Sequence, residues 1–62
     1  MPKNSNNIEI GFEILNNLLN FAELNYQKKE YFRTEIALDQ LSITAQIISK
    51  LLVSYCKNNL TE

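Results

Sequence analysis

Few residues of this 62-residue chain could take part in catalysis. Cys56 is the one cysteine, histidine is absent, and the base nearest to Cys56 in the sequence is its neighbour Lys57. Covalent catalysis needs a serine or cysteine nucleophile held beside a general base, most often histidine. The serines in the second half of the chain have only lysines and carboxylates as potential partners: Ser42, Ser49 and Ser54. We therefore expect a protein that is not an enzyme and has no small-molecule substrate.

Paired carboxylates occur at helical spacing, at Glu9 and Glu13 and again at Glu35 and Asp39. Metal sites in helical bundles combine such carboxylates with histidine in a Glu-x-x-His pattern, which this sequence does not contain. A single cysteine likewise excludes a disulfide framework and most zinc sites. The carboxylates are expected at the solvated beginnings of helices, and no cofactor or metal is expected.

Cations and aromatic rings gather between positions 26 and 33, where the sequence reads YQKKEYFR. Basic charge interleaved with aromatic rings can hold RNA or single-stranded nucleic acid, through phosphate contacts and base stacking. Against this, Glu30 dilutes the local charge, and the whole chain has a net charge of -1. The same residues would also suit the end of a helical hairpin. We expect this tip to bind a partner through Tyr31, Phe32, Arg33, Lys28 and Lys29.

Asparagines are frequent in the first half of the chain, although asparagine is a mediocre helix former. They stand at Asn16, Asn17, Asn20 and Asn25. They either reflect overall composition or form a hydrogen-bonding face for a partner, and the sequence leaves both readings open.

Two segments repeat their apolar residues with the period of an α-helix. In segment 8–28 the stripe consists of Ile8, Phe12, Leu15, Leu19, Ala22 and Tyr26. In segment 31–57 it consists of Tyr31, Thr34, Leu38, Leu41, Ala45, Ile48, Leu52 and Tyr55. The predicted fold class is therefore all-α.

The order of charges indicates two helices and not one continuous helix. Glu9 and Glu13 open the first segment and Lys28 and Lys29 close it, and a similar order recurs in the second segment. Acidic residues first and basic residues last suit the helix dipole. We predict a flexible tail over 1–7 and a single antiparallel hairpin domain over 8–60. Its helices should span about 8–28 and about 30–58, with Phe12 facing Ile48.

A hairpin this small leaves a second apolar stripe without cover. Exposed apolar surface of that size marks an interaction site. An isologous homodimer, which makes a four-helix bundle, would cover it. The predicted self-interface consists of Ile36, Ile43, Ile47, Leu18 and Phe21.

These patterns favour a small regulatory interaction protein, an adaptor or inhibitor, that docks its helix faces onto a larger protein partner. Further anchors are expected at the far end of the second helix, at Val53 and Leu60. Two alternatives stay open: a dimeric hairpin that binds RNA or DNA through its tip, and a structural subunit of a larger assembly.

The chain is expected in the cytoplasm, with no membrane partner. Its uninterrupted apolar runs are no longer than three residues, as at 51–53, and no apolar segment follows the N-terminus. A membrane-spanning helix needs about 20 predominantly apolar residues. A lone cysteine also fits a reducing compartment.

Overall fold

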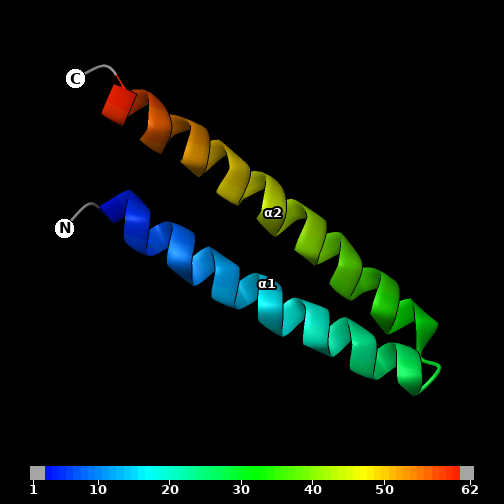
Figure 1. Cartoon of the computed structure of the whole chain (residues 1–62). Coiled ribbons are helices and arrows are strands. Elements are labelled where there is room, and N and C mark those ends of the chain that lie inside the picture. The colour runs from blue at the N-terminus through cyan, green and yellow to red at the C-terminus, as the bar shows by residue number, and fades with distance from the viewer. Residues whose placement is uncertain (1–2, 61–62) are drawn as a thin grey trace.

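The computed structural model describes the backbone of residues 3–60 and the side chains of residues 7–57. It consists of two antiparallel helices, α1 (Lys3–Gln27) and α2 (Tyr31–Leu60), which lie side by side (Figure 1). The predicted all-α hairpin is thus confirmed. The first helix begins at Lys3, five residues earlier than its apolar stripe indicates, so that most of the segment expected as a tail is helical.

The connection between the helices is a tight turn over residues 28–30, where the order of charges places it. Lys29 has a φ of 64°, in the left-handed region. Its N–H donates to the carbonyl of Tyr26 at 2.9 Å, and the N–H of Glu30 donates to the carbonyl of Asn25 at 2.8 Å. This pair of bonds is the Schellman motif, which satisfies the last carbonyls of a helix and usually has glycine at the left-handed position.

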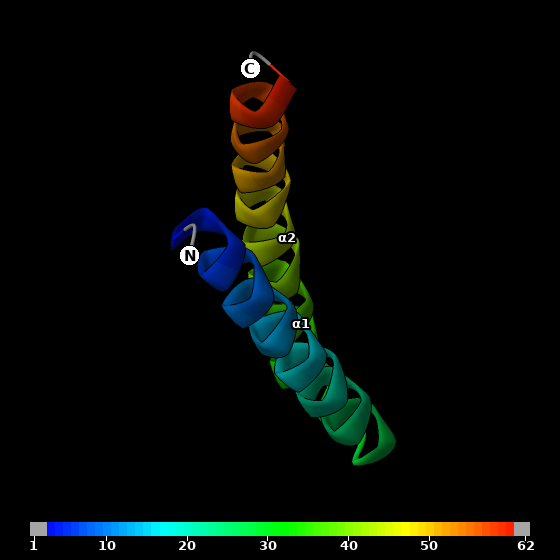
Figure 2. The same cartoon turned by 60° about the vertical axis from the view of Figure 1, so that its left-hand side comes forward.

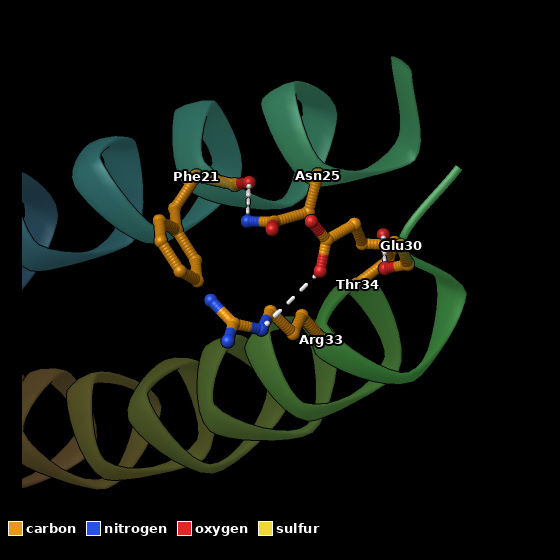
Figure 3. A network of polar contacts seen from close by, with 5 residues as sticks. All are labelled: Phe21, Asn25, Glu30, Arg33 and Thr34. Atoms are coloured by element: carbon orange, nitrogen blue, oxygen red, sulfur yellow. Dashed lines mark hydrogen bonds and ion pairs between the residues drawn. The ribbon is translucent and has the colours of Figure 1, made fainter. Parts of the chain in front are cut away.

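Glu30 both completes this turn and begins the second helix. Its carbonyl accepts the N–H of Thr34 at 3.0 Å, the first hydrogen bond of α2, and the Thr34 hydroxyl at 2.9 Å. Its carboxylate lies 3.3 Å from Nε of Arg33 (Figure 3). One residue therefore ties the end of α1 to the first turn of α2, which explains how the chain reverses with only three connecting residues.

The helices meet along a seam that combines small side chains with leucines and isoleucines. Ala22 and Ala37 are the most buried apolar residues, and Gly11 is buried as well. A Cβ atom at Gly11 would lie 2.6 Å from Cγ1 of Ile48. The helix backbones therefore approach closely at this position. The described residues that are buried or half-buried are Ile8, Gly11, Leu15, Leu18, Ala22, Asn25, Thr34, Ala37, Leu41, Thr44, Ala45, Ile48, Leu51 and Tyr55.

At about half of its positions, the seam contains the residue that precedes the one the sequence predicts. Gly11, and not Phe12, lies against Ile48. The same shift turns Leu19 and Leu38 outward. The physical reason is that glycine and alanine let the helices approach closely, whereas a row of Phe and Leu in the seam would hold them apart. The predicted seam residues that are instead exposed are Phe12, Leu19, Tyr26, Tyr31, Leu38 and Leu52.

The hairpin is long and thin, with extents of 50 × 17 × 11 Å. Its radius of gyration is 14.6 Å, whereas a globular domain of this length has about 11 Å. The thinnest dimension equals the diameter of one helix, about 10–12 Å. In Figure 2 the last turns of α2 also reach past the beginning of α1. Both broad faces of the hairpin therefore meet solvent, with no second layer over either.

The left-handed residue in the turn gives a first prediction. Lys29→Gly should raise the free energy of unfolding by up to about 1 kcal/mol, because glycine adopts this conformation without the Cβ penalty. The matched control is Lys28→Gly, which removes the same charge one residue earlier. The N–H of Lys28 still makes a helical bond to Leu24 at 3.1 Å, so glycine there should destabilise the protein. Thermal unfolding that ranked the two variants in the opposite order would contradict this account of the turn.

The close approach at Gly11 gives a second prediction. Gly11→Ala should lower the melting temperature, because a new methyl group against Ile48 overpacks the seam at a cost of about 1–3 kcal/mol. This cost should exceed the gain in helix propensity, about 1 kcal/mol. In an Ile48→Ala background the clash disappears, and the same substitution should become stabilising. All variants are compared at one protein concentration, with Asn20→Ala as an exposed control that reports propensity alone. Equal effects of Gly11→Ala in the two backgrounds would show that the contact does not limit the approach of the helices.

Candidate functional site

Most large apolar side chains of the hairpin lie outside its seam. Among the residues whose side chains are described, fifteen large apolar ones are at least 39% exposed, from Ile10 to Val53. The four buried apolar residues include two alanines. Single exposed apolar residues are normal, but contiguous sets mark interaction sites. Ten of them form two sets, one on each broad face.

The first set is called the isoleucine face here and consists of Ile14, Phe21, Ile36, Ile43 and Ile47. In α2 the isoleucines follow Arg33 in one row at helical spacing. In Figure 3 the ring of Phe21, on α1, points toward the Arg33 guanidinium group. Ile14 precedes Phe21 by two helical turns and so lies on the same side of α1. All five side chains are between 44% and 54% exposed.

The second set lines an open groove on the opposite side, near the turn, and is called the tip groove. Its apolar lining consists of Leu19, Tyr26, Tyr31, Phe32 and Leu38. The rings of Tyr26 and Tyr31 lie 5.9 Å apart at an interplanar angle of 58°. This tilted pair joins the last turn of α1 to the first turn of α2, because its members come from opposite sides of the connection.

The tip groove has two adjoining parts of about 500 and 610 Å³, which share Tyr26, Thr34 and Leu38. Two charged residues line it, Glu23 from α1 and Glu35 from α2, and both are negative. The groove therefore combines an apolar floor with acidic walls.

The structure divides the predicted tip residues between different surroundings. Tyr31 and Phe32 line the tip groove, and Phe32 is 74% exposed. Arg33 lies in the row of the isoleucine face and pairs with Glu30. Lys28 and Lys29 are exposed in the turn and are not among the groove-lining residues. The cations and aromatic rings that adjoin in sequence are thus partly separated in space.

The predicted self-interface residues lie together, with one exception. Phe21, Ile36, Ile43 and Ile47 share the isoleucine face. Leu18 is half-buried in the seam within the hairpin, because its place in the helical period falls between Leu15 and Ala22.

The structure describes the side chain of only one of the two anchors expected at the far end of α2. Val53 is 58% exposed and stands between the half-buried Leu51 and Tyr55, so it points away from the seam. The side chain of Leu60 lies outside the described residues.

The sequence pattern does not single out Leu19, Leu38, Glu23 and Glu35 as site residues. The spacing of Leu19 and Leu38 predicts them in the seam, and the glutamates stand in ordinary polar positions of the sequence. The signal that could have found them is Gly11, the one glycine of the chain. A glycine within a helical apolar stripe marks a close approach of another backbone, which would have moved the seam by one residue.

Asn25 differs from the other asparagines of α1. It is 5% exposed, and its Nδ2 donates to the carbonyl of Phe21 at 2.7 Å (Figure 3). It is therefore not available to a partner, whereas Asn16, Asn17 and Asn20 are exposed.

By its length and composition alone, the helix α2 is long and apolar enough to cross a membrane. Within Tyr31–Lys57, a window of 18 residues has a mean hydropathy of 1.4. The expectation of no membrane partner, drawn from the shortness of the apolar runs, stays a prediction. One such helix is weak evidence for a span, and a charged residue at the bilayer centre costs about 2.5–3.5 kcal/mol. Asp39 and Lys50 both lie within this helix.

No group of three or more metal-ligating side chains lies together in the described part of the chain. Cys56 is exposed. Comparisons with protein-family models, with curated proteins and with solved structures found no match for this chain. Inferences about function therefore start from the two apolar faces.

The burial of Asn25 gives a third prediction. Asn25→Asp should lower the free energy of unfolding by about 1–3 kcal/mol at neutral pH, because a buried carboxylate would face the Phe21 carbonyl with no proton to donate. The loss should shrink as the pH falls toward about 4, because burial beside a carbonyl raises the pKa of the introduced carboxyl above its value of about 3.9 in the unfolded chain. Asn20→Asp, on the exposed side of the same helix, is the control and should change stability little. Equal losses at both positions, measured by urea unfolding, would show that the Asn25 hydrogen bond is unimportant.

Proposed function

We propose that this chain is a small non-enzymatic interaction protein that forms a homodimeric four-helix bundle and docks onto a larger protein partner. One observation carries the proposal. The seam covers one stripe of each helix, in which Gly11, Ala22 and Ala37 stand among leucines and isoleucines, while fifteen large apolar side chains outside it are at least 39% exposed. A protein that worked as a lone hairpin would be expected to leave fewer large apolar residues outside its own seam.

The energetics support a partner for these faces. Complete burial of one large apolar side chain stabilises a protein by about 1.5–3 kcal/mol. The side chains of the isoleucine face keep about half of their surface exposed, so a second layer would gain a substantial part of this energy from each. A chain of this size rarely obtains more than about 3–5 kcal/mol from its own core. Association is therefore a physically adequate way to stabilise the hairpin.

The isoleucine face is the better candidate for the contact between two copies. Arg33 and Lys50 stand at the two ends of its isoleucine row on α2, and the exposed Glu13 and Asp39 lie just beyond the face. Charges of both signs border this face, so two copies can meet there without bringing only like charges together. Apolar layers between paired hairpins of this kind make four-helix bundles.

The nucleic-acid alternative has less support. Binding to phosphates would depend on Lys28, Lys29 and Arg33 at the tip. Of these, Arg33 already pairs with Glu30, and the aromatic rings beside them line a groove with acidic walls. A structural subunit of a larger assembly stays the other alternative, and it differs in requiring its neighbours in order to fold.

Substitution of the central isoleucine tests the dimer. Ile43→Asp should shift the mass in sedimentation equilibrium from about twice 7.2 kDa toward 7.2 kDa at low micromolar concentration, because a buried carboxylate opposes assembly. The matched control is Gln46→Asp, which adds the same charge at a neighbouring exposed position of α2 and should leave the mass unchanged.

Three outcomes would count against parts of the proposal. A monomeric wild-type chain would exclude the homodimer. An unchanged mass for Ile43→Asp would show that the contact lies elsewhere. A wild-type chain without a cooperative melt would favour the structural subunit, and salt-sensitive binding to a mixed RNA pool would favour the nucleic-acid alternative.

A further inference from the structure

We propose that the tip groove is a docking site for one basic amphipathic helix of another protein. This inference deepens the docking role proposed above by naming the chemistry of the partner. It does not depend on the isoleucine face being the contact between two copies.

The dimensions of the groove suit a helix. Leu19 and Tyr26 stand seven residues apart on α1, which is two turns or about 10.5 Å. Leu38 forms the opposite edge from α2, and Tyr31 and Phe32 close the end at the turn. Apolar anchors at positions i, i+3 or i+4 and i+7 of a bound helix span the same distance. A helix bound along the tip groove would thus contact an apolar residue of the groove at each helical turn that lies within it.

The charges around the groove favour a positively charged partner. Next to the floor, the outer row of α1 contains Glu9, Asn16 and Glu23. The corresponding row of α2 contains Glu35, Ser42 and Ser49. In the part of the chain that the structure describes, the charged members of these two rows are all acidic. Lysine or arginine on the flanks of a docked helix would therefore face a carboxylate on either side.

The same charges disfavour the other occupants. A second copy of the hairpin at this groove would bring its own Glu23 and Glu35 against those of the first copy. Like charges brought together at an interface oppose association. An anionic lipid surface or an acidic peptide would meet the same repulsion. The isoleucine face, bordered by both signs, does not have this selectivity.

Binding of a designed peptide tests the proposal. The probe is a fluorescent peptide of about 18 residues, with leucine at helical i, i+3, i+4 and i+7 positions and lysine on the other face. The comparison peptide has glutamate in place of every lysine. We expect the basic peptide to bind the full chain with measurable anisotropy change, and the acidic peptide not to bind. Amide resonances of Leu19, Tyr26 and Leu38 should shift in the NMR spectrum of the protein, while those of Ile43 and Ile47 should not.

Charge reversal at the groove provides the matched variant. Glu23→Lys with Glu35→Lys should weaken binding by about tenfold or more, because two attractions become repulsions. The control is Asn20→Lys with Gln46→Lys, which adds positive charge at exposed positions of both helices outside the groove lining and should have a much smaller effect. Leu38→Ser should also weaken binding, because it removes an apolar anchor from the floor. Circular dichroism of each variant checks that the helices are retained.

Several results would overturn the proposal. Equal binding of the acidic peptide, equal weakening by the groove variant and its control, or resonance shifts confined to the isoleucine face would each show that the groove is not the site. A loss of dimer mass in Leu38→Ser would show that a second copy occupies the groove. This test is independent of the test of the dimer. An unchanged mass for Ile43→Asp would contradict only the proposed self-interface. A dimer that does not bind the basic peptide would contradict only the proposed role of the tip groove.

Discussion

The structure depends on the close approach of two helix backbones at Gly11. A Cβ atom there would lie 2.6 and 2.7 Å from carbon atoms of Ile48, closer than side chains pack. This contact fixes which residues of each helix face the other helix. The direction of every side chain follows from its spacing along the helix from Gly11 or Ile48. Ala22 and Ala37 fall in the same seam and are nearly inaccessible to solvent. Many large apolar residues are consequently placed on the flanks of both helices, where the seam cannot cover them.

The turn makes this arrangement possible with three connecting residues. Lys29 takes the left-handed conformation that glycine usually supplies, and Glu30 contributes bonds to both helices. A short, well-bonded turn permits little sliding of one helix past the other. The register that begins at the turn is therefore kept as far as Gly11 and Ile48. Asn25, buried beside the turn, adds a polar group whose hydrogen bond is satisfied within its own helix.

The two apolar faces that result have different chemistry. The isoleucine face combines branched aliphatic side chains with borders of both charge signs. The tip groove combines aromatic rings and leucines with acidic walls at Glu23 and Glu35. A hairpin only 11 Å thick presents both faces at once, so that one can associate with a second copy while the other remains free for a different protein. This division of surfaces is the physical basis of the proposed docking role.

The sequence by itself determined the elements, because helical periodicity and charge order are local properties. The two apolar stripes predicted the helices, and the order of acidic and basic residues placed the turn at 28–30. Only the tertiary structure decided which of the neighbouring stripes forms the seam. Both Phe12 and Gly11 have spacings that suit a seam, and pattern matching favours the larger residue. The choice depends on how near the backbones can come, which is a property of the pair of helices. The same contact decided that Leu18 lies inside, that Leu19 and Leu38 line a groove, and that Arg33 and Tyr31 face different sides.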